Sequence, residues 1–214
     1  MVGLDEVGRG CLAGPVVVAA VAFCLEEFEA WQKCQNSRQR KKLWFSEVND
    51  SKLLLPEKRK ELSLRILEKC AVQIAWAMPE HIDERNILWA CFDAMREALW
   101  PFSGLVSTLL VDGHLNPLSP RYGAPEGFAE KVGISKVETL IKGDSRSFSI
   151  AAASIVAKVF RDEWMEELHK DFAHYGWNQN RGYPTKLHRE GLRKFGLSPW
   201  HRRSFTMDLK SGLE

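Results

Sequence analysis

Four acidic residues stand where short apolar segments of the chain end, and together they could hold metal ions. The four are Asp5, Glu6, Asp112 and Asp144. Mg²⁺ and Mn²⁺ prefer hard oxygen ligands, and phosphodiester cleavage commonly uses two such ions to stabilise the attacking and leaving oxygens. A lone carboxylate among apolar neighbours would be costly without a cation. The pattern therefore favours two-metal hydrolysis of phosphodiester bonds.

Each acid also has a purely structural alternative. Asp112-Gly113 and Gly143-Asp144 have the composition of turns, and aspartates at strand ends often cap helices. For any single aspartate that alternative is favoured. The set of four, together with a basic C-terminal region, shifts the balance toward a metal site.

The adjacent acids Asp5 and Glu6 pose a geometric problem. Successive residues of a regular strand point to opposite faces, so both cannot face one metal from an undistorted strand. We therefore predict that the strand ends or bulges here, where Gly8, Arg9 and Gly10 follow. Two glycines would let backbone amides and Arg9 approach a ligand closely. A plain glycine-rich hairpin would explain the glycines but not an arginine beside the acids.

Positive charge is concentrated near the C-terminus. Residues 181–203 hold seven Lys and Arg residues against one acid, Glu190, in a chain whose net charge is +2. A basic surface beside an acidic body suits a polyanion held against a metal site, because phosphate contacts supply sequence-independent affinity. The alternative is an ordinary solvated, charged helix.

Length and composition limit the class of protein. The chain has 214 residues, of which 45% are hydrophobic, so we expect one domain with one core. Its five cysteines include no C-x-x-C pair, which suits a reduced, cytoplasmic protein. The longest apolar run, 16–25, cannot span a bilayer, and no leader-like segment opens the chain. We therefore expect neither membrane insertion nor export, and a monomer is the default.

Hydrophobic periodicity predicts alternating strands and helices. Apolar, β-branched runs predict strands at 2–5, 16–23, 72–78, 108–112 and 137–142. Helical spacing predicts helices at 56–70, 83–101, 150–172 and 185–195, the second capped by Asp83. This order favours an α/β or α+β domain with helices packed on a central sheet. An insertion at 26–45 and a loop at 113–136 have no role that we can assign.

Seven blocks of the chain resemble ribonuclease HII, and they occur in that family's order. The blocks are residues 3–15, 49–53, 110–113, 142–145, 151–162, 182–185 and 201–205. Seven ordered blocks over nearly the whole chain exclude a chance match. The resemblance implies an α/β, ribonuclease H-like fold with a central mixed β-sheet flanked by helices. It also implies one catalytic domain over 1–214, with a core at about 1–172 and a basic C-terminal helical extension at about 173–214 that binds substrate.

The resemblance further implies an activity and a cofactor. The family hydrolyses the RNA strand of RNA–DNA hybrids and incises duplex DNA 5′ of a single ribonucleotide, leaving 3′-hydroxyl and 5′-phosphate ends. Its metal-binding carboxylates, for Mg²⁺ or Mn²⁺, fall on Asp5, Glu6, Asp112 and Asp144. Asp5 is expected to bridge two ions, and Asp162 has no role in this mapping. No protein partner is inferred.

Substrate recognition is implied for two elements of the chain. In the family, Gly8, Arg9 and Gly10 would read the 2′-hydroxyl at the RNA–DNA junction, and Tyr183 would stack on the neighbouring deoxyribose. The 2′-hydroxyl distinguishes RNA from DNA and must be met by close hydrogen bonds. A tyrosine here could also be an ordinary core or surface residue. Four secondary candidates could contact phosphates or be ordinary surface groups: Ser51, Lys52, Lys142 and Lys158.

The chain differs from the family's usual pattern, and two other functions are considered as alternatives. Only four residues precede Asp5, so the first strand is expected to fray. There is no room for the N-terminal substrate-binding domain of ribonuclease HIII, and no clamp-binding peptide is evident after Phe205. One rival is a hybrid-binding module without catalysis, which would bind but not cut. The other is a carboxylate-pair glycosidase, which has no use for a basic C-terminal region.

Overall fold

The computed structural model describes residues 1–23, 33, 44–48, 51 and 53–205. Most of the predicted insertion at 26–45 lies outside the described residues, as does Lys52. Of the helices within those ranges, none combines the length and apolar character that a membrane span requires.

Strands and helices alternate along the described chain. The strands are β1 (Val2–Val7), β2 (Val16–Ala22), β3 (Ala71–Ala77), β4 (Thr108–Asp112) and β5 (Lys136–Leu140). The α-helices are α3 (Pro56–Lys69), α4 (Pro79–Arg85), α5 (Ile87–Leu99), α6 (Phe128–Lys131), α7 (Phe148–Asp171), α8 (Trp177–Asn180) and α9 (Lys186–Phe195). Short 3-10 turns are η1 (Trp44–Glu47), η2 (Trp100–Phe102), η3 (Pro120–Tyr122), η4 (Gly143–Ser145) and η5 (Ala173–Tyr175).

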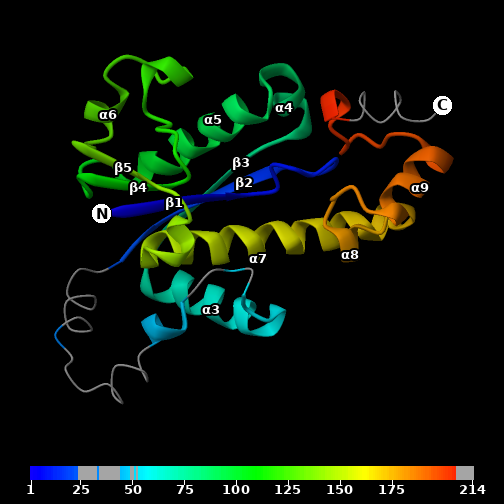
Figure 1. Cartoon of the computed structure of the whole chain (residues 1–214), viewed down its shortest axis with the longest axis horizontal. Helices are drawn as coiled ribbons and strands as arrows, with labels where there is room; N and C mark the ends of the chain where they lie inside the picture. The colour runs from blue at the N-terminus through cyan, green and yellow to red at the C-terminus, as the bar shows by residue number, and fades with distance from the viewer. Residues whose placement is uncertain (24–32, 34–43, 49–50, 52, 206–214) are drawn as a thin grey trace.

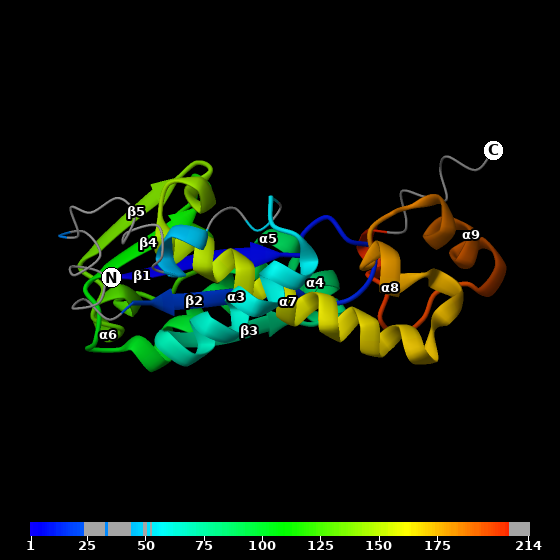
Figure 2. The ribbon, with the colours of Figure 1, turned by 90° about the horizontal axis from the view of Figure 1, so that it is seen from below.

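The strands form one mixed sheet in the order β3-β2-β1-β4-β5. The central strand, β1, is antiparallel to β2 and parallel to β4, while β3 and β5 form the edges. Helices α4 and α5 lie on one face of the sheet and α7 lies on the other, with α3 packed against α7 (Figures 1 and 2). The predicted central mixed sheet flanked by helices is confirmed.

The close packing of α7 on the sheet depends on small residues. All seven residues of β2 are buried and apolar, as expected for a strand covered on both faces. A Cβ on Gly3 would lie 2.4 Å from the Ser149 carbonyl carbon, so β1 approaches the helix closely. The facing residues 151–153 are buried alanines. Helix α7 therefore lies directly on the strand that carries Asp5.

The C-terminal elements gather where α7 extends beyond the sheet. There η5, α8 and α9 lie together at one end of the molecule (Figure 1), around a small core that includes Met165, Tyr175 and Trp177. Helix α9 begins after Thr185, whose hydroxyl accepts a hydrogen bond from the His188 N–H, and ends before Gly196. The helix predicted at 185–195 is confirmed, while the division of the chain at 172/173 stays a prediction.

Three local expectations were wrong. Asp83 does not cap a helix: it lies inside α4, where its carboxylate accepts hydrogen bonds from the backbone N–H groups of Arg203 and Ser204, each at 2.9 Å. The cap of α5 is Asn86, whose side chain accepts hydrogen bonds from two backbone N–H groups of the first turn. The single helix predicted at 83–101 is therefore two helices, α4 and α5. The first strand is not frayed either, because β1 is paired with β4 from Val2 onward.

Candidate active site

Asp5 and Asp112 lie next to each other at the ends of neighbouring strands. Leu4 of β1 pairs with Val111 of β4 in parallel register, so the residues that follow them come together. Because side chains alternate along a strand, both carboxylates point to the face covered by α7. Asp5 is only 6% exposed and hydrogen-bonds with the Ser154 hydroxyl of α7.

Glu6 leaves the same strand on the opposite face. The ladder between β1 and β2 stays regular through Glu6 and Val7, so the strand ends where Gly8, Arg9 and Gly10 follow, as predicted, but no bulge turns both acids to one face. The carboxylate of Glu6 forms an ion pair with Arg9 at 3.1 Å. The Glu6 backbone N–H donates to Asp5 Oδ1 at 2.8 Å. The two acids are therefore joined through the backbone while their side chains diverge.

Asp144 lies in η4, the turn that follows β5, next to a residue that bonds Asp112. The Gly143 N–H donates to Asp112 Oδ1 at 2.7 Å, which ties this turn to the end of β4. A Cβ on Gly143 would lie 2.6 Å from Ile150 Cδ1 and 3.2 Å from the same Asp112 oxygen, so a larger residue would displace one of these side chains. Asp144 is buried and lines a hollow of about 150 Å³ with Ser147 and others at the start of α7.

The electrostatics of these acids favour a bound cation. Burial and the nearby charge of Glu6 raise the pKa of Asp5 well above its usual range, with Asp112 adding to the effect and the Ser154 hydrogen bond opposing it. Burial also raises the pKa of Glu6, against the opposing effect of Arg9. A divalent cation would relieve the cost of keeping both carboxylates ionised.

The donor set fits such a cation by chemistry, since it consists of carboxylate oxygens. Within the described ranges, however, no three Asp, Glu, His or Cys side chains converge as a group that could hold an ion. Asp5 and Asp112 share one face of the sheet and Glu6 lies on the other. Binding of an ion by all four carboxylates therefore requires side-chain movement.

The two glycines that flank Arg9 have different tasks. Gly8 is buried with φ +93°, and a Cβ there would lie 2.2 Å from Nε of Arg161. Gly10 is exposed, and a Cβ there would meet nothing within 4 Å. We predicted that both glycines admit a ligand. Internal packing therefore requires a glycine at Gly8, whereas Gly10 lies on open surface, and the approach of a ligand to their backbone stays a prediction.

Tyr183 lies beside this loop. The Leu12 N–H donates to the Gly182 carbonyl at 2.8 Å, which joins the segment after Gly10 to the residue before Tyr183. Tyr183 is 40% exposed, and its partial burial, with the nearby Cys11 thiol, raises the pKa of its hydroxyl. The structure thus brings together the loop and the tyrosine that the resemblance named, from positions far apart in the sequence.

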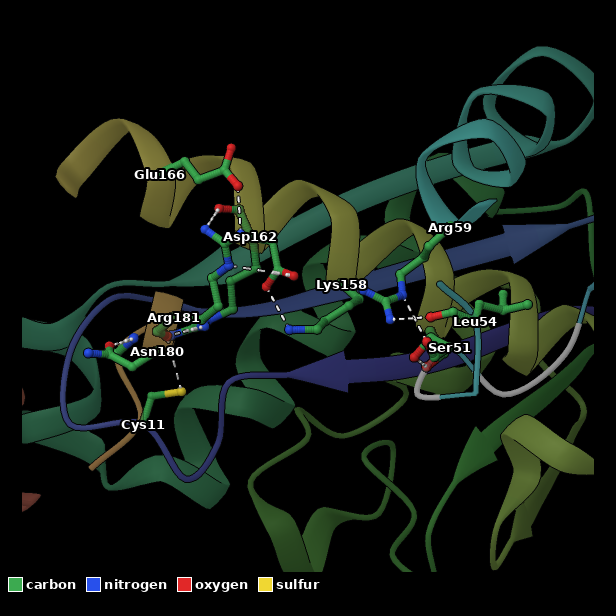
Figure 3. A network of polar contacts seen from close by, with 12 residues as sticks. Cys11, Ser51, Leu54, Arg59, Lys158, Asp162, Glu166, Asn180 and Arg181 are labelled. Atoms are coloured by element: carbon green, nitrogen blue, oxygen red, sulfur yellow. Dashed lines mark hydrogen bonds and ion pairs between the residues drawn. The ribbon is translucent and has the colours of Figure 1, made fainter. Parts of the chain in front are cut away.

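Three of the four secondary candidates, Ser51, Lys142 and Lys158, lie within the described residues and have different surroundings. The Ser51 hydroxyl lies 2.9 Å from the Ser154 hydroxyl, so it supports the residue that bonds Asp5. Arg59 holds the Ser51 segment by donating to the Ser51 and Leu54 carbonyls, each at 2.8 Å (Figure 3). Lys142 is exposed at a left-handed turn position.

A network of charges follows the exposed side of α7 (Figure 3). Lys158 donates to Asp162 at 2.7 Å, and Arg181 donates to Glu166 at 2.6 Å. Asp162 is thus engaged with Lys158 and lies outside the group of strand-end acids.

Three residues with clear structural roles at the site were missed from the sequence. They are Ser154, which bonds Asp5, and the buried Arg161 and Arg202, which bond the loop around Arg9. All three lie within the resembling blocks 151–162 and 201–205. A polar residue on an otherwise apolar helix face was the available signal for Ser154.

Comparison with known proteins shows the family of this chain. The profile of the family described as Ribonuclease HII matches residues 2–208. The chain belongs to the ribonuclease HII family. The ribonuclease HII of Chloroherpeton thalassium is 43% identical over 206 residues, covering 96% of this chain and 89% of that protein. That of Ruegeria sp. is 41% identical over 203 residues, covering 95% and 76%. Membership makes this chain a ribonuclease H, an endoribonuclease that hydrolyses phosphodiester bonds in RNA–DNA hybrids.

Solved structures agree with the fold of this ribonuclease HII family member. The ribonuclease HII in the PCNA:RNase HII complex from Archaeoglobus fulgidus superposes with a TM-score of 0.70 at 28% identity, covering 94% of this chain and 93% of that one. Ribonuclease H2 from Pyrococcus horikoshii gives a TM-score of 0.72 at 24% identity, covering 99% and 97%. Bst-RNase HIII in complex with Mn²⁺ also gives 0.72, at 20% identity, covering 100% and 70%. The predicted ribonuclease H-like fold is confirmed.

Proposed function

We propose that this ribonuclease HII family member cleaves RNA–DNA hybrids and also incises duplex DNA 5′ of a single embedded ribonucleotide, leaving 3′-hydroxyl and 5′-phosphate ends. One juxtaposition carries the proposal. The exposed Gly10 lies in a loop joined on one side to the strand-end acids through the Glu6–Arg9 ion pair and on the other to Tyr183. The loop that would recognise one ribose is therefore adjacent to the proposed cleavage centre.

The cleavage centre is assigned to four carboxylates. Asp5, Glu6, Asp112 and Asp144 would hold Mg²⁺ or Mn²⁺, two ions in the catalytic state. When bound, the ions activate the attacking water and stabilise charge on the leaving oxygen. Ser154 orients Asp5, and the Gly143 N–H orients Asp112. The Glu6–Arg9 ion pair holds one ligand near the loop that contacts the substrate.

Substrate recognition is assigned to the loop, the tyrosine and the C-terminal extension. The backbone of Gly8, Arg9 and Gly10 would meet the 2′-hydroxyl, which only close hydrogen bonds can distinguish from hydrogen. The half-exposed Tyr183 ring would pack on the adjoining deoxyribose, where an additional hydroxyl would fit badly. The basic helix α9 would contact phosphates and add affinity without sequence preference. Cytoplasmic localisation and a monomeric state stay predictions.

The test is cleavage of a DNA duplex that carries one ribonucleotide, compared with an RNA–DNA hybrid, in Mg²⁺ or Mn²⁺ and with a chelator. Asp112→Asn should lower kcat by about a thousandfold or more on both, because loss of Lewis-acid stabilisation is worth several kcal/mol. Asp171→Asn, at the exposed end of α7, is the matched control and should retain activity.

Three results would contradict the proposal. Undiminished cleavage by Asp112→Asn would remove that residue from the centre. Activity on the hybrid without incision at the single ribonucleotide would remove the finer substrate assignment. Binding of the hybrid without metal-dependent cutting would favour the non-catalytic module instead.

A further inference from the structure

A buried arginine from the C-terminal segment bonds the backbone of the Gly-Arg-Gly loop. Arg202 is fully buried, and its Nη1 donates to the Arg9 carbonyl at 3.0 Å. Its Nε and Nη2 both donate to the Gly14 carbonyl, at 3.0 and 2.9 Å. The Phe205 ring lies 5.2 Å from the guanidinium carbon. The planar guanidinium is therefore fixed in orientation and spans both ends of the loop.

A second buried arginine fixes the end of the same loop. Arg161 of α7 is fully buried and donates to the carbonyls of Pro15 and Ala13 at 2.8 and 3.0 Å. Its remaining nitrogen donates to the Arg181 carbonyl, which also accepts from the Cys11 thiol; the thiol contact is visible in Figure 3. The loop is thus held from inside by two fixed guanidinium groups that bond main-chain oxygens.

The bond to the Arg9 carbonyl determines where the next N–H points. The peptide between Arg9 and Gly10 is trans, so its C=O and N–H point in opposite directions. Since the carbonyl points inward to Arg202, the Gly10 N–H points outward. Gly10 is exposed, and its N–H makes no hydrogen bond with any described residue. A fixed donor therefore faces open surface beside the strand-end acids.

Arg202 keeps its charge while buried. Burial lowers the pKa of its guanidinium to about 10, so the group is protonated at neutral pH. A lysine could not reproduce this arrangement, because an ammonium group lacks the rigid planar set of donors that reaches two carbonyls at once. Arginine is therefore required for geometry as well as for charge.

We propose that Arg202 is a positioning residue for ribose recognition, which turns the Gly10 N–H toward the substrate by bonding the Arg9 carbonyl. Arg202 itself touches no substrate in this role. The inference rests on the proposed function, in which the loop reads the 2′-hydroxyl. It adds that the C-terminal segment sets the selectivity of a loop almost two hundred positions earlier in the chain.

The test compares affinities for two duplexes that differ by one hydroxyl group. Binding is measured by fluorescence anisotropy in Mg²⁺, in an Asp112→Asn background that prevents cleavage, with a duplex bearing one ribonucleotide and with the all-DNA duplex. The ratio of the two affinities reports recognition of the 2′-hydroxyl. Arg202→Lys should lower this ratio about tenfold, the effect of one misplaced hydrogen bond, and change all-DNA affinity by no more than about twofold.

Arg96→Lys is the matched control. Arg96 is also buried and donates to backbone carbonyls, including that of Pro117 at 2.8 Å, but it lies on α5 away from the loop. Its replacement should lower thermal stability and leave the affinity ratio unchanged. A ratio that stays at the parent value in folded Arg202→Lys would overturn the inference, as would equal losses on both duplexes.

The parent protein separates the two levels of the proposal. A parent that shows no preference for the ribonucleotide duplex would contradict the proposed function, whatever Arg202 does. A parent that shows the preference, with no loss in Arg202→Lys, would contradict only the positioning role.

A second measurement covers the case in which Arg202→Lys does not fold. In the unaltered protein, the nitrogen-bound guanidinium protons of Arg202 should give resolved, slowly exchanging NMR signals, because each bonded N–H is buried. A single averaged signal from a rotating guanidinium would overturn the inference without any substitution.

Discussion

At the scale of single residues, the strand-end acids are held in an arrangement that is unfavourable without metal. Asp5 is nearly buried beside Glu6 and Asp112, and its principal compensation is the Ser154 hydroxyl. Enzymes commonly keep such groups at a cost to stability, because the site is built for its ligand and not for the folded state alone. The cost should be measurable when metal is removed.

Asp5→Asn should stabilise the protein in the presence of a chelator. Substitution removes a buried charge and its repulsion with Glu6, so we expect a rise in Tm of at least about 2 °C, equivalent to about 1 kcal/mol. In excess Mg²⁺ the order should reverse, because the unaltered protein gains binding energy that the variant lacks. Scanning calorimetry with and without the ion checks this. A lower Tm in chelator would argue against the burial cost.

The two glycines around Arg9 should respond oppositely to alanine. Gly8→Ala places a Cβ 2.2 Å from Arg161 at φ +93°, so we expect a loss of about 2 kcal/mol or more in the free energy of unfolding. Gly10→Ala meets open space and should change stability by no more than about 0.5 kcal/mol. Urea unfolding of the pair distinguishes packing from recognition. Equal effects would show that the loop is not held as described.

At the scale of elements, a pair of histidines joins the segments around α9. His188 Nδ1 donates to the Tyr183 carbonyl at 2.9 Å, so its Nε2 must accept the Trp177 Nε1–H at 3.1 Å. His201 Nδ1 accepts the Ser198 N–H at 2.9 Å, so its Nε2 donates to His188 Nε2 at 3.0 Å. These partners require both rings to be neutral.

Acid should therefore weaken the C-terminal extension through this pair. Burial lowers the pKa of His201 to about 3, with the nearby rings of His188 and His174 adding to the effect, and burial also lowers the pKa of His188. The unfolded chain takes up protons at about pH 6.5 and the folded protein does not, so stability is complete above that pH and falls toward pH 3.

The measurement is the free energy of unfolding in urea from pH 7 to pH 4. His201→Asn should give a shallower pH dependence than the unaltered protein, although its stability at pH 7 is lower. His114→Asn, at an exposed position, is the matched control and should leave the slope unchanged. An identical slope in His201→Asn would show that the buried ring does not account for acid sensitivity.

At the scale of the whole molecule, charge is divided between two regions that a duplex would touch together. The acids lie at the strand ends, and the exposed cations of α9, including Arg189 and Arg193, lie where α7 extends beyond the sheet (Figure 2). Phosphate contacts of this kind release counterions, so they make affinity depend steeply on salt.

Replacing both Arg189 and Arg193 with glutamine should weaken binding of hybrid and all-DNA duplex alike. We expect the slope of log K against log salt to fall by about 1 to 2, because each phosphate contact contributes about 0.9. The double variant Lys69→Gln, Lys136→Gln removes the same charge outside the C-terminal region and is the control. A slope unchanged by the first pair, or changed equally by both pairs, would contradict an α9 contact.

The sequence by itself determined the elements and the chemistry of the acids. Apolar runs of strand length and helical spacing depend only on neighbours in the chain, so β4 and α9 were predicted within one residue at each end. The position of Asp112 at the end of a strand could be predicted for the same reason, whereas Asp144 lies in η4, beyond the end of β5 at Leu140. The errors came where local signals compete: Asp83 has the composition of a cap, yet a distant backbone segment takes its carboxylate.

Only the tertiary structure decided which residues stand together and why the glycines are there. Parallel pairing of β1 with β4 places Asp5 beside Asp112, and no local pattern encodes that register. Gly8 is glycine because Arg161 occupies the space of its Cβ, and the Gly10 N–H faces outward because Arg202 takes the carbonyl of Arg9. Such constraints arise from contacts between segments distant in the chain, which composition and periodicity do not record.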